Sequence, residues 1–229
     1  EKHQSLSIHS TDWEDELVKV TIIYDNTACE KTLEADWGFA ALIEAYGRIL
    51  LFDTGANGEI LLRNMRVLKI DPLSISDLFI SHGHFDHIGG LSHFLNENRN
   101  IVLHAPVSLR GVRQAKEVRY YDKPQKIHDH FITTGELEQI EQSLAVETEK
   151  GLLVIAGCSH PAMENILGAF SSFGTVYGIV GGLHGFDQFH LFAKMGLICP
   201  THCTQHAADL EKHFPWTYTK GGAGRILEI

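Results

Sequence analysis

The stretch LFISHGHFDHIGGL, residues 78–91, places three histidines and one aspartate within six consecutive positions. These residues are His82, His84, Asp86 and His87; an apolar run precedes them and two glycines follow. Such a segment is either a polar loop after a strand or a metal site. The density of potential ligands favours the metal site, because a structural role rarely needs so many imidazoles and carboxylates together.

The spacing divides the cluster into two pairs. His82 and His84 are two residues apart, so in an extended segment their side chains project to the same side. Both could then reach one ion at about 2.0–2.1 Å, the usual zinc–nitrogen distance. Asp86 and His87 follow at a turn and could face a second ion. Gly83 removes side-chain bulk between the first two ligands.

Length and composition are those of an ordinary globular protein. The 229 residues are 44% apolar and 21% charged, and we expect a single domain over residues 1–229 with a loose polar arm at 1–16. The sequence has no run of about 18 apolar residues, so no transmembrane helix is expected, and residues 1–17 do not resemble a signal peptide. The four cysteines form no CxxC pair, which favours reduced thiols and a cytoplasmic location.

Charge and histidine content bear on the partners of the protein. A formal net charge of −10 makes it a poor general binder of nucleic acid, because phosphate binding rests largely on Lys and Arg. No basic amphipathic segment suggests binding to a membrane surface. The 15 histidines favour a metal enzyme without locating its site. Several histidines in polar surroundings are expected at the surface: His3, His9, His128, His130 and His213.

The second half of the chain repeats one pattern, a buried-type strand that ends in a histidine and is followed by a helix. The strands are GLLVIAGCSHP (151–161), VYGIVGGLHGF (176–186) and LICPTHCTQ (197–205), with helices expected at 162–174, 187–196 and 206–214. Earlier segments predict strands at 18–26, 38–56 (two strands and a tight turn), 71–82 and 100–106, and helices at 58–70 and 88–98. This alternation predicts α/β layers, in which sites form at the carboxyl ends of strands.

Histidines at the ends of these strands complete two sets of metal ligands. His160 joins His82 and His84 to give the three protein ligands of a catalytic zinc, and His202 completes the set begun by Asp86 and His87. Two ions about 3.5–4 Å apart could share a bridging water, which is a nucleophile at neutral pH. Zinc suits these donors best, with one or two ions per chain, and manganese, iron or nickel could also bind.

Three further residues near the strand ends each have two interpretations. Asp53, in LLFDTG, either accepts a hydrogen bond from the outer nitrogen of a ligand histidine or caps the following turn. Cys158 and Cys203 lie within two residues of His160 and His202. Small buried packing is the favoured interpretation for both thiols, and coordination or oxidation is the alternative.

Residues 107–130 are basic and aromatic and contain no specific motif. The favoured interpretation is a solvated helix and loop, and the alternative is a lid or a substrate-binding insert. In the second case the segment would supply phosphate-binding and ring-stacking side chains. The candidates are Arg110, Arg113 and Lys116 for phosphates, and Tyr120 and Tyr121 for a ring.

These motifs, taken together, resemble a known superfamily. SHGHFDHIGG is similar to the HxHxDH signature of the metallo-β-lactamase superfamily, and the order of LLFDTG before it and strand-terminal histidines after it is also similar. GFAALIEAYGRILLFDTG, TGELEQI, GLLVIAGCSHPAMENI, GIVGGLHGF and PTHCT resemble the subgroup of 7,8-dihydropterin-6-yl-methyl-4-(β-D-ribofuranosyl)aminobenzene 5′-phosphate synthase. The resemblance implies an αββα four-layer sandwich with the metals at one edge, between two sheets.

One departure from the superfamily concerns the strand GIVGGLH. Many binuclear members have a bridging aspartate at its end, where this sequence has His184. A neutral imidazole cannot bridge two ions as a carboxylate does, so the second ion could be weak, absent or held differently. His184 is either a metal ligand or a catalytic residue beside Asp86 that contacts the substrate or transfers a proton.

Three functions are compatible with these residues. The first is a metal-dependent hydrolase in which metal-activated water attacks an ester, phosphoester or lactone. The second, implied by the name of the subgroup, is a transferase that acts on a pterin diphosphate. The third is a non-catalytic metal-binding or redox-sensing module, against which an open site with strand-end ligands argues. Either enzyme would take a small substrate, anionic or phosphorylated.

Overall fold

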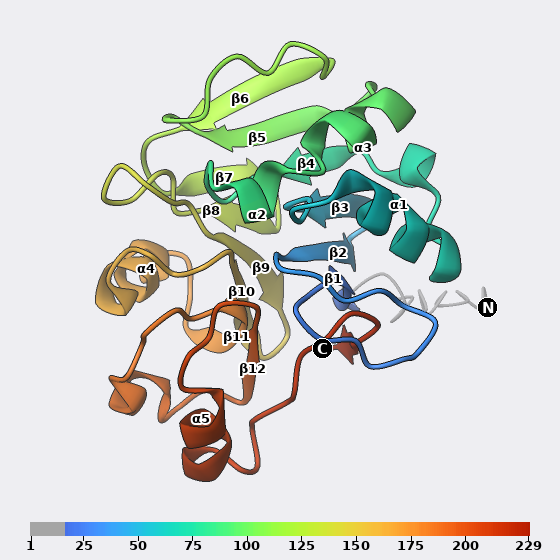
Figure 1. Ribbon diagram of the computed structural model, residues 1–229. Coiled ribbons are helices and arrows are strands. Elements are labelled where there is room, and N and C mark those ends of the chain that lie inside the picture. The colour runs from blue at the N-terminus through green and yellow to red at the C-terminus, as the bar shows by residue number, and fades with distance from the viewer. Residues whose placement is uncertain (1–16) are drawn as a thin grey trace, which may run out of the picture.

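The computed structural model describes residues 17–229, so the arm predicted at 1–16 lies outside the described residues. Within them the chain forms two β-sheets that pack face to face around a shared apolar core, and helices cover the outer face of each sheet (Figure 1). The N-terminal half, blue to green, forms most of one sheet, and the second half, yellow to red, forms most of the other. This is the αββα sandwich predicted from the sequence.

The strands of the first sheet are, in spatial order, β13 (Ile226–Glu228), β1 (Lys19–Tyr24), β2 (Ala40–Ala45), β3 (Arg48–Phe52), β4 (Asp77–Phe79), β5 (Val102–Pro106) and β6 (Glu117–Tyr121). Those of the second are β12 (Leu197–Thr201), β11 (Val176–Gly182), β10 (Gly151–Ala156), β9 (Leu144–Thr148), β8 (Phe131–Thr133) and β7 (Gln125–His128). The helices are α1 (Gly58–Val67), α2 (Phe85–Ile88), α3 (Leu91–Glu97), α4 (Met163–Phe170) and α5 (Ala207–His213), with 3-10 turns η2 (Pro72–Ser74) and η3 (Phe189–Phe192). In this described part of the chain no helix is long and apolar enough to cross a membrane.

The alternation of side chains along each strand explains the four layers. In β3, Leu50 and Phe52 point between the sheets while Leu51 packs under α1 and α3. In β10, Leu153 points between the sheets while Val154 packs under α4 and α5. Because successive side chains point to opposite faces, a strand that is apolar throughout must be covered on both sides.

The parallel part of each sheet positions the histidines. β3 and β4 are parallel neighbours, and so are β10, β11 and β12. The carboxyl ends of parallel neighbours lie at the same edge of a sheet. Asp53 and His82 follow the first two strands, and His160, His184 and His202 follow the other three, so both sheets direct their candidate residues to one edge of the sandwich.

Residues 107–130 differ from the predicted helix and loop. They contain β6 and β7, the strands at the outer edges of the two sheets, so the predicted helix is wrong. β6 leaves three of its five residues exposed and pairs only with β5. An edge strand of this kind lacks the apolar alternation that a sequence pattern can reveal. The role of this segment as a lid or insert stays a prediction.

Two further segments of the second half were not predicted correctly. The helix expected at 187–196 is only the 3-10 turn η3, where Phe186 packs against both Phe189 and Phe192. Side chains three residues apart align on a 3-10 turn, so Phe189 and Phe192 lie on one side of η3, where Phe186 contacts both. The strands β8 and β9 were not predicted, and β8 has only three residues.

Asp77, at the start of β4, contacts His104 of the same sheet and His128 of the other sheet, so His128 connects the two sheets. Its Oδ1 lies 2.8 Å from His104 Nε2 and 2.9 Å from His128 Nε2, and His104 Nδ1 lies 2.8 Å from the Tyr121 hydroxyl. His128, with a side chain only 14% exposed, is therefore not the surface residue that was predicted. Burial opposes ionisation of Asp77, but hydrogen bonds from His104, Ser76 and His128 outweigh it and hold the pKa of this carboxyl below its usual range.

The substitution Asp77→Asn should lower the free energy of unfolding by about 1–3 kcal/mol, because both histidines lose a charged acceptor. Since the pKa of Asp77 is lowered by folding, its contribution is fully present above the unfolded value of about 3.9 and is lost as the pH falls through the folded value. As the pH falls through this range, Asp77→Asn should therefore lose less stability than the wild type. Chemical denaturation over a series of pH values measures both effects.

The matched control for this experiment is Asp122→Asn, at an exposed position directly after β6. It removes the same charge without a buried partner and should change stability by less than about 0.5 kcal/mol. Equal losses in the two variants, or identical pH profiles for Asp77→Asn and the wild type, would contradict the role assigned to Asp77.

Candidate metal centre

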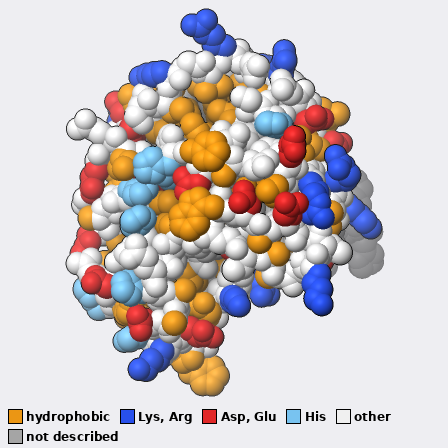
Figure 2. All heavy atoms as spheres, viewed as in Figure 1, with side chains coloured by type: hydrophobic (Ala, Val, Ile, Leu, Met, Phe, Trp, Pro, Cys, Tyr) orange, Lys and Arg blue, Asp and Glu red, His pale blue; other side chains and the backbone are white. Residues whose placement is uncertain are grey.

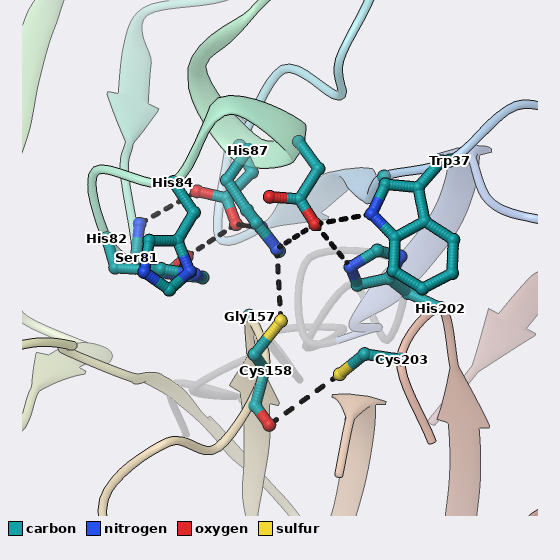
Figure 3. Close-up of polar contacts among 12 residues, drawn as sticks. Trp37, Ser81, His82, His84, His87, Gly157, Cys158, His202 and Cys203 are labelled. Atoms are coloured by element: carbon teal, nitrogen blue, oxygen red, sulfur yellow. Dashed lines mark hydrogen bonds and ion pairs between the residues drawn. The ribbon is translucent and has the colours of Figure 1, made fainter. Parts of the chain in front are cut away.

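The predicted histidine ligands converge where the carboxyl ends of the two sheets meet, and Figure 3 shows His82, His84, His87 and His202 there. The centres of the His82 and His84 rings are 4.5 Å apart, and they lie 4.9 and 4.8 Å from the His160 ring. The His87 ring lies 5.1 Å from that of His202. Because the His82 and His87 rings are 4.2 Å apart, the two predicted sets are adjacent.

The buried carboxylate of Asp53 contacts one histidine of each ligand set, His87 directly and His82 through Ser81. Its Oδ2 lies 2.7 Å from His87 Nδ1 and accepts a hydrogen bond from Ser81 Oγ at 2.6 Å, while its Oδ1 accepts the Ser81 N–H at 2.7 Å. Since the Ser81 hydroxyl donates to Asp53, it can accept from His82 Nδ1, 2.9 Å away. The Nδ1 atoms of His82 and His87 are thus engaged on the outside, and their Nε2 atoms remain for the centre.

Asp86 and His202 form the other arm of the site. Asp86 Oδ2 accepts a hydrogen bond from Trp37 Nε1 at 2.9 Å and lies 3.0 Å from His202 Nε2. His202 Nδ1 lies 3.0 Å from Asn26 Oδ1, and the Trp37 ring packs edge-on against the His202 ring. These contacts fix the His202 ring, which lies next to Trp37 in Figure 3, with its Nε2 beside Asp86.

The donor atoms fit a metal ion. His160 Nε2 is buried and has no hydrogen-bond partner in the described part of the chain, a costly state for an imidazole unless a cation binds there. Among the described residues, three groups have donor atoms within 4.8 Å of one another, and two of the three lie at this site. These two are His82, Cys158 and His160, and His87, Cys158 and His202, and the third is Asp77, His104 and His128. Imidazole and thiolate donors at this spacing suit zinc and related transition metals.

Burial favours the neutral form of most of these imidazoles. It lowers the pKa of His82 well below its usual range, and neighbouring histidines add to the effect. Burial and neighbouring histidines lower the pKa values of His160 and His202 to about 4. His87 differs from these three, because Asp53 outweighs burial and raises its pKa. Neutral imidazole is the form that coordinates metals.

A cavity of about 400 Å³ opens beside His160 and His184 and is lined by residues 159–164 and 183–188. The His184 ring lies 5.1 Å from the His160 ring, and its backbone has the left-handed φ of 44°. His184 is exposed and, like the predicted ligands His84 and Asp86, belongs to neither donor group of the site. Figure 2 shows histidine side chains gathered on this face beside hydrophobic and acidic ones.

The substrate contacts predicted in residues 107–130 lie away from this cavity. Arg110 stacks on the ring of Tyr120, with 4.1 Å from its guanidinium carbon to the ring centre, and both side chains are exposed. Arg113 and Lys116 are also exposed. Tyr121 is buried, and its hydroxyl is engaged by His104 between the sheets. None of these five side chains lines the cavity beside His160.

Glu141 is a buried site residue that sequence analysis missed. Its Oε1 accepts the backbone N–H groups of Gly157, Cys158 and Ser159 at 3.0, 2.9 and 3.1 Å, and its Oε2 accepts that of His160 at 2.9 Å. Burial raises the pKa of Glu141, and these hydrogen bonds oppose that shift. The orientation of the loop that carries His160 therefore depends on one carboxylate. The only sequence signal is an acidic residue directly after TGELEQI (134–140), which an exposed loop would show equally.

A match to a protein family agrees with this geometry. Residues 38–162, more than half of the chain, match the metallo-β-lactamase superfamily. The chain belongs to that superfamily, and the resemblance inferred from the histidine motif is confirmed. Known members of it include metal-dependent hydrolases and a synthase.

Individual relatives cover nearly the whole chain. The 7,8-dihydropterin-6-methyl-4-(β-D-ribofuranosyl)-aminobenzene-5′-phosphate synthase of Methanocaldococcus jannaschii is 26% identical over 286 residues, which cover 94% of this chain and 97% of that protein. The crystal structure of Tm1679, a metal-dependent hydrolase of the β-lactamase superfamily, matches 93% of this chain and 99% of its own with a TM-score of 0.76 and 24% identity. The crystal structure of Zn²⁺-bound PqqB from Methylobacterium extorquens covers 92% of this chain and 100% of its own chain, with a TM-score of 0.61 and 11% identity. The two structural likenesses establish a shared fold.

The substitution Glu141→Gln should disturb both folding and metal binding. The amide would turn an N–H₂ group toward backbone N–H donors, so we expect the free energy of unfolding to fall by about 1–3 kcal/mol. Because the loop carries His160, metal affinity should fall by about 10–100-fold. Chemical denaturation and a metal titration with a competing chelator measure the two effects.

The matched control is Glu138→Gln, in the same segment. Glu138 is exposed, and one of its oxygens, Oε1, accepts both the Ala162 N–H at 3.0 Å and the Asn165 amide at 2.7 Å, which a glutamine oxygen can also do. It should change stability by less than about 0.5 kcal/mol and leave metal affinity intact. Unchanged metal affinity in Glu141→Gln would show that His160 does not depend on this carboxylate.

Proposed function

We propose that the protein is a metal-dependent hydrolase that cleaves an ester, phosphoester or lactone bond in a small anionic substrate. The side chains would hold one or two ions, with zinc the best fit to the donors. The two ligand sets would be His82, His84 and His160, and Asp86, His87 and His202. The ions would supply Lewis acidity and a nucleophilic water at neutral pH.

The observation that carries this proposal is the buried, unshared nitrogen of His160. A buried imidazole nitrogen without a metal-binding role is expected to have a hydrogen-bond partner. By contrast, Ser81 and Asp53 engage the outer nitrogens of His82 and His87. This division between outer hydrogen bonds and inner donors is typical of histidines that coordinate a metal.

The chain's own residues would orient the substrate and move protons. His184 borders the cavity next to His160, where an imidazole could donate a proton to a leaving group. Asp86 is held by Trp37 at the opposite side of the centre, where its carboxylate could accept a proton. His184 and Asp86 are thus candidates for the general acid and the general base on either side of the reacting bond.

The surroundings of the site support a small substrate with a flat ring. A cavity of about 400 Å³ suits a small molecule, and the net charge of −10 disfavours nucleic acid. Trp37 is 57% exposed and Phe85, next to Asp86, is 72% exposed. Exposed aromatic rings beside candidate ligands offer surfaces on which a ring could stack.

A transferase that acts on a pterin diphosphate is the second candidate. The similarity to the M. jannaschii synthase over 94% of this chain favours it. The same ligand sets would hold the diphosphate leaving group, and Trp37 or Phe85 could stack on the pterin. However, the basic side chains of residues 107–130 do not border the cavity, so hydrolysis remains the better supported reaction.

The double substitution His82→Ala/His84→Ala should lower the metal content by about one equivalent per chain, because it removes two of the three ligands in one set. Elemental analysis of the purified proteins measures this loss. Turnover should be lost as well in a screen of phosphodiesters, lactones, β-lactams and pterin diphosphates with added metal. The products formed by the wild type separate hydrolysis from group transfer.

The control for the double variant is His93→Ala, which removes an exposed imidazole from α3 and should keep both metal and activity. Unchanged metal content in the double variant would contradict the assigned ligands. Turnover by the wild type that survives chelation would contradict every metal-dependent mechanism, and metal binding without turnover of any compound would favour the non-catalytic module.

The substitution Trp37→Ala should raise KM by roughly 2- to 10-fold, the loss expected for one aromatic stacking contact. Trp37→Phe keeps a ring but removes the N–H that bonds to Asp86, so it should lower kcat more than it raises KM. Trp216→Ala, at a 95% exposed position, is the control and should change neither constant. An unchanged KM in Trp37→Ala would exclude Trp37 as a substrate contact.

A further inference from the structure

Cys158 lies between the two histidine sets. Its side chain is 3% exposed, and its Sγ lies 3.2 Å from His87 Nε2 (Figure 3). The same sulfur belongs to the donor group of His82 and His160 and to that of His87 and His202. Donors bound to one tetrahedral ion at about 2.0–2.3 Å lie roughly 3–4 Å apart, which agrees with the distance to His87.

The surroundings of Cys158 are unlike those of a cysteine that only fills space. Cys199 is part of the apolar core between the sheets, whereas Cys158 belongs to none of the three apolar clusters of the described residues. The Cys158 side chain points to imidazole nitrogens instead. Cys203 lies nearby, but its Sγ contacts the backbone oxygen of Cys158 at 3.8 Å and belongs to neither donor group.

The backbone of Cys158 is held in a fixed direction. Glu141 accepts its N–H at 2.9 Å and also those of Gly157 and Ser159 on either side. Ser159 then takes the left-handed φ of 57°, where the chain turns toward His160. The loop therefore presents the Cys158 sulfur and the His160 ring to the same centre from fixed positions.

Bound divalent ions would favour an anionic donor at this place. Among the proposed ligands, five are imidazoles and only Asp86 is a carboxylate, so the ligands themselves would offset one of the four positive charges of two divalent ions. A thiolate at Cys158 would add a negative charge between the two sets. Thiolate is also a strong ligand for zinc and related soft metals.

We propose that Cys158 Sγ is a metal ligand shared by the two histidine sets. This inference rests on the metal centre of the proposed function. On coordination the S–H bond breaks, its proton leaves to solvent and a sulfur–metal bond forms. The site would then contain seven side-chain donors rather than six.

Titration of the metal-free, full-length protein with Co²⁺ in the absence of oxygen tests the proposal. We expect thiolate-to-cobalt charge-transfer absorption in the near ultraviolet that grows with bound cobalt. Cys158→Ser should abolish this absorption and weaken cobalt binding by about 10-fold or more. Cys203→Ser, near the site, and Cys199→Ala, in the apolar core, should retain it.

X-ray absorption of the cobalt-loaded wild type gives an answer that does not depend on the folding of any variant. A sulfur neighbour at about 2.3 Å from the metal would support the proposal. Cobalt bound with nitrogen and oxygen neighbours alone would overturn it while leaving the metal centre of the proposed function intact. Charge-transfer absorption that disappears in Cys203→Ser but persists in Cys158→Ser would also overturn it, and failure of the wild type to bind cobalt would count against the proposed function itself.

Discussion

The candidate metal centre depends on one buried charge, the carboxylate of Asp53. Removing a carboxylate from water costs several kcal/mol unless hydrogen bonds replace its hydration, and here Ser81 and His87 provide them. Through Ser81 the same carboxylate also orients His82. One side chain at the end of β3 therefore sets the direction of a donor in each ligand set, although both histidines follow the neighbouring strand β4.

The turns that follow the strands of the site share one kind of backbone strain. Asp53, Ser159, His184 and His202 have φ values of 54°, 57°, 44° and 45°, in the left-handed region that residues with a Cβ seldom adopt. Each such residue costs on the order of 1 kcal/mol or more. Hydrogen bonds hold two of these turns in place, because Asp25 accepts the N–H of His202 and Glu141 accepts that of Ser159. The strain thus falls where the chain leaves a strand and must aim a side chain at the centre.

The sequence predicted the parts of the site that rest on side-chain identity. A parallel strand covered on both faces leaves an unbroken apolar run, and a histidine directly after that run marks the sheet edge, so the order of residues alone groups His82, His160 and His202. Glu141 could not be found in this way, because it acts on backbone N–H groups that every residue except proline possesses, and no residue type at positions 157–160 reveals that acceptor. The edge strands β6 and β7 were also missed. β6 pairs with β5 along one edge, and its exposed residues show no apolar pattern that the sequence could reveal.

Several buried carboxylates surround imidazoles that are mostly neutral. Asp53, Glu141 and Asp25 are all less than 4% exposed, and burial raises the pKa of Asp25 to about 6 despite hydrogen bonds from His202 and Asn26. At an effective dielectric constant of about 20, a unit charge about 5 Å from another interacts by about 3 kcal/mol. The same carboxylates that are costly to bury without a counter-ion would therefore attract a cation to the centre. Because these carboxylates also hold the loops that carry the candidate ligands, metal binding would contribute directly to the stability of the edge where the two sheets meet.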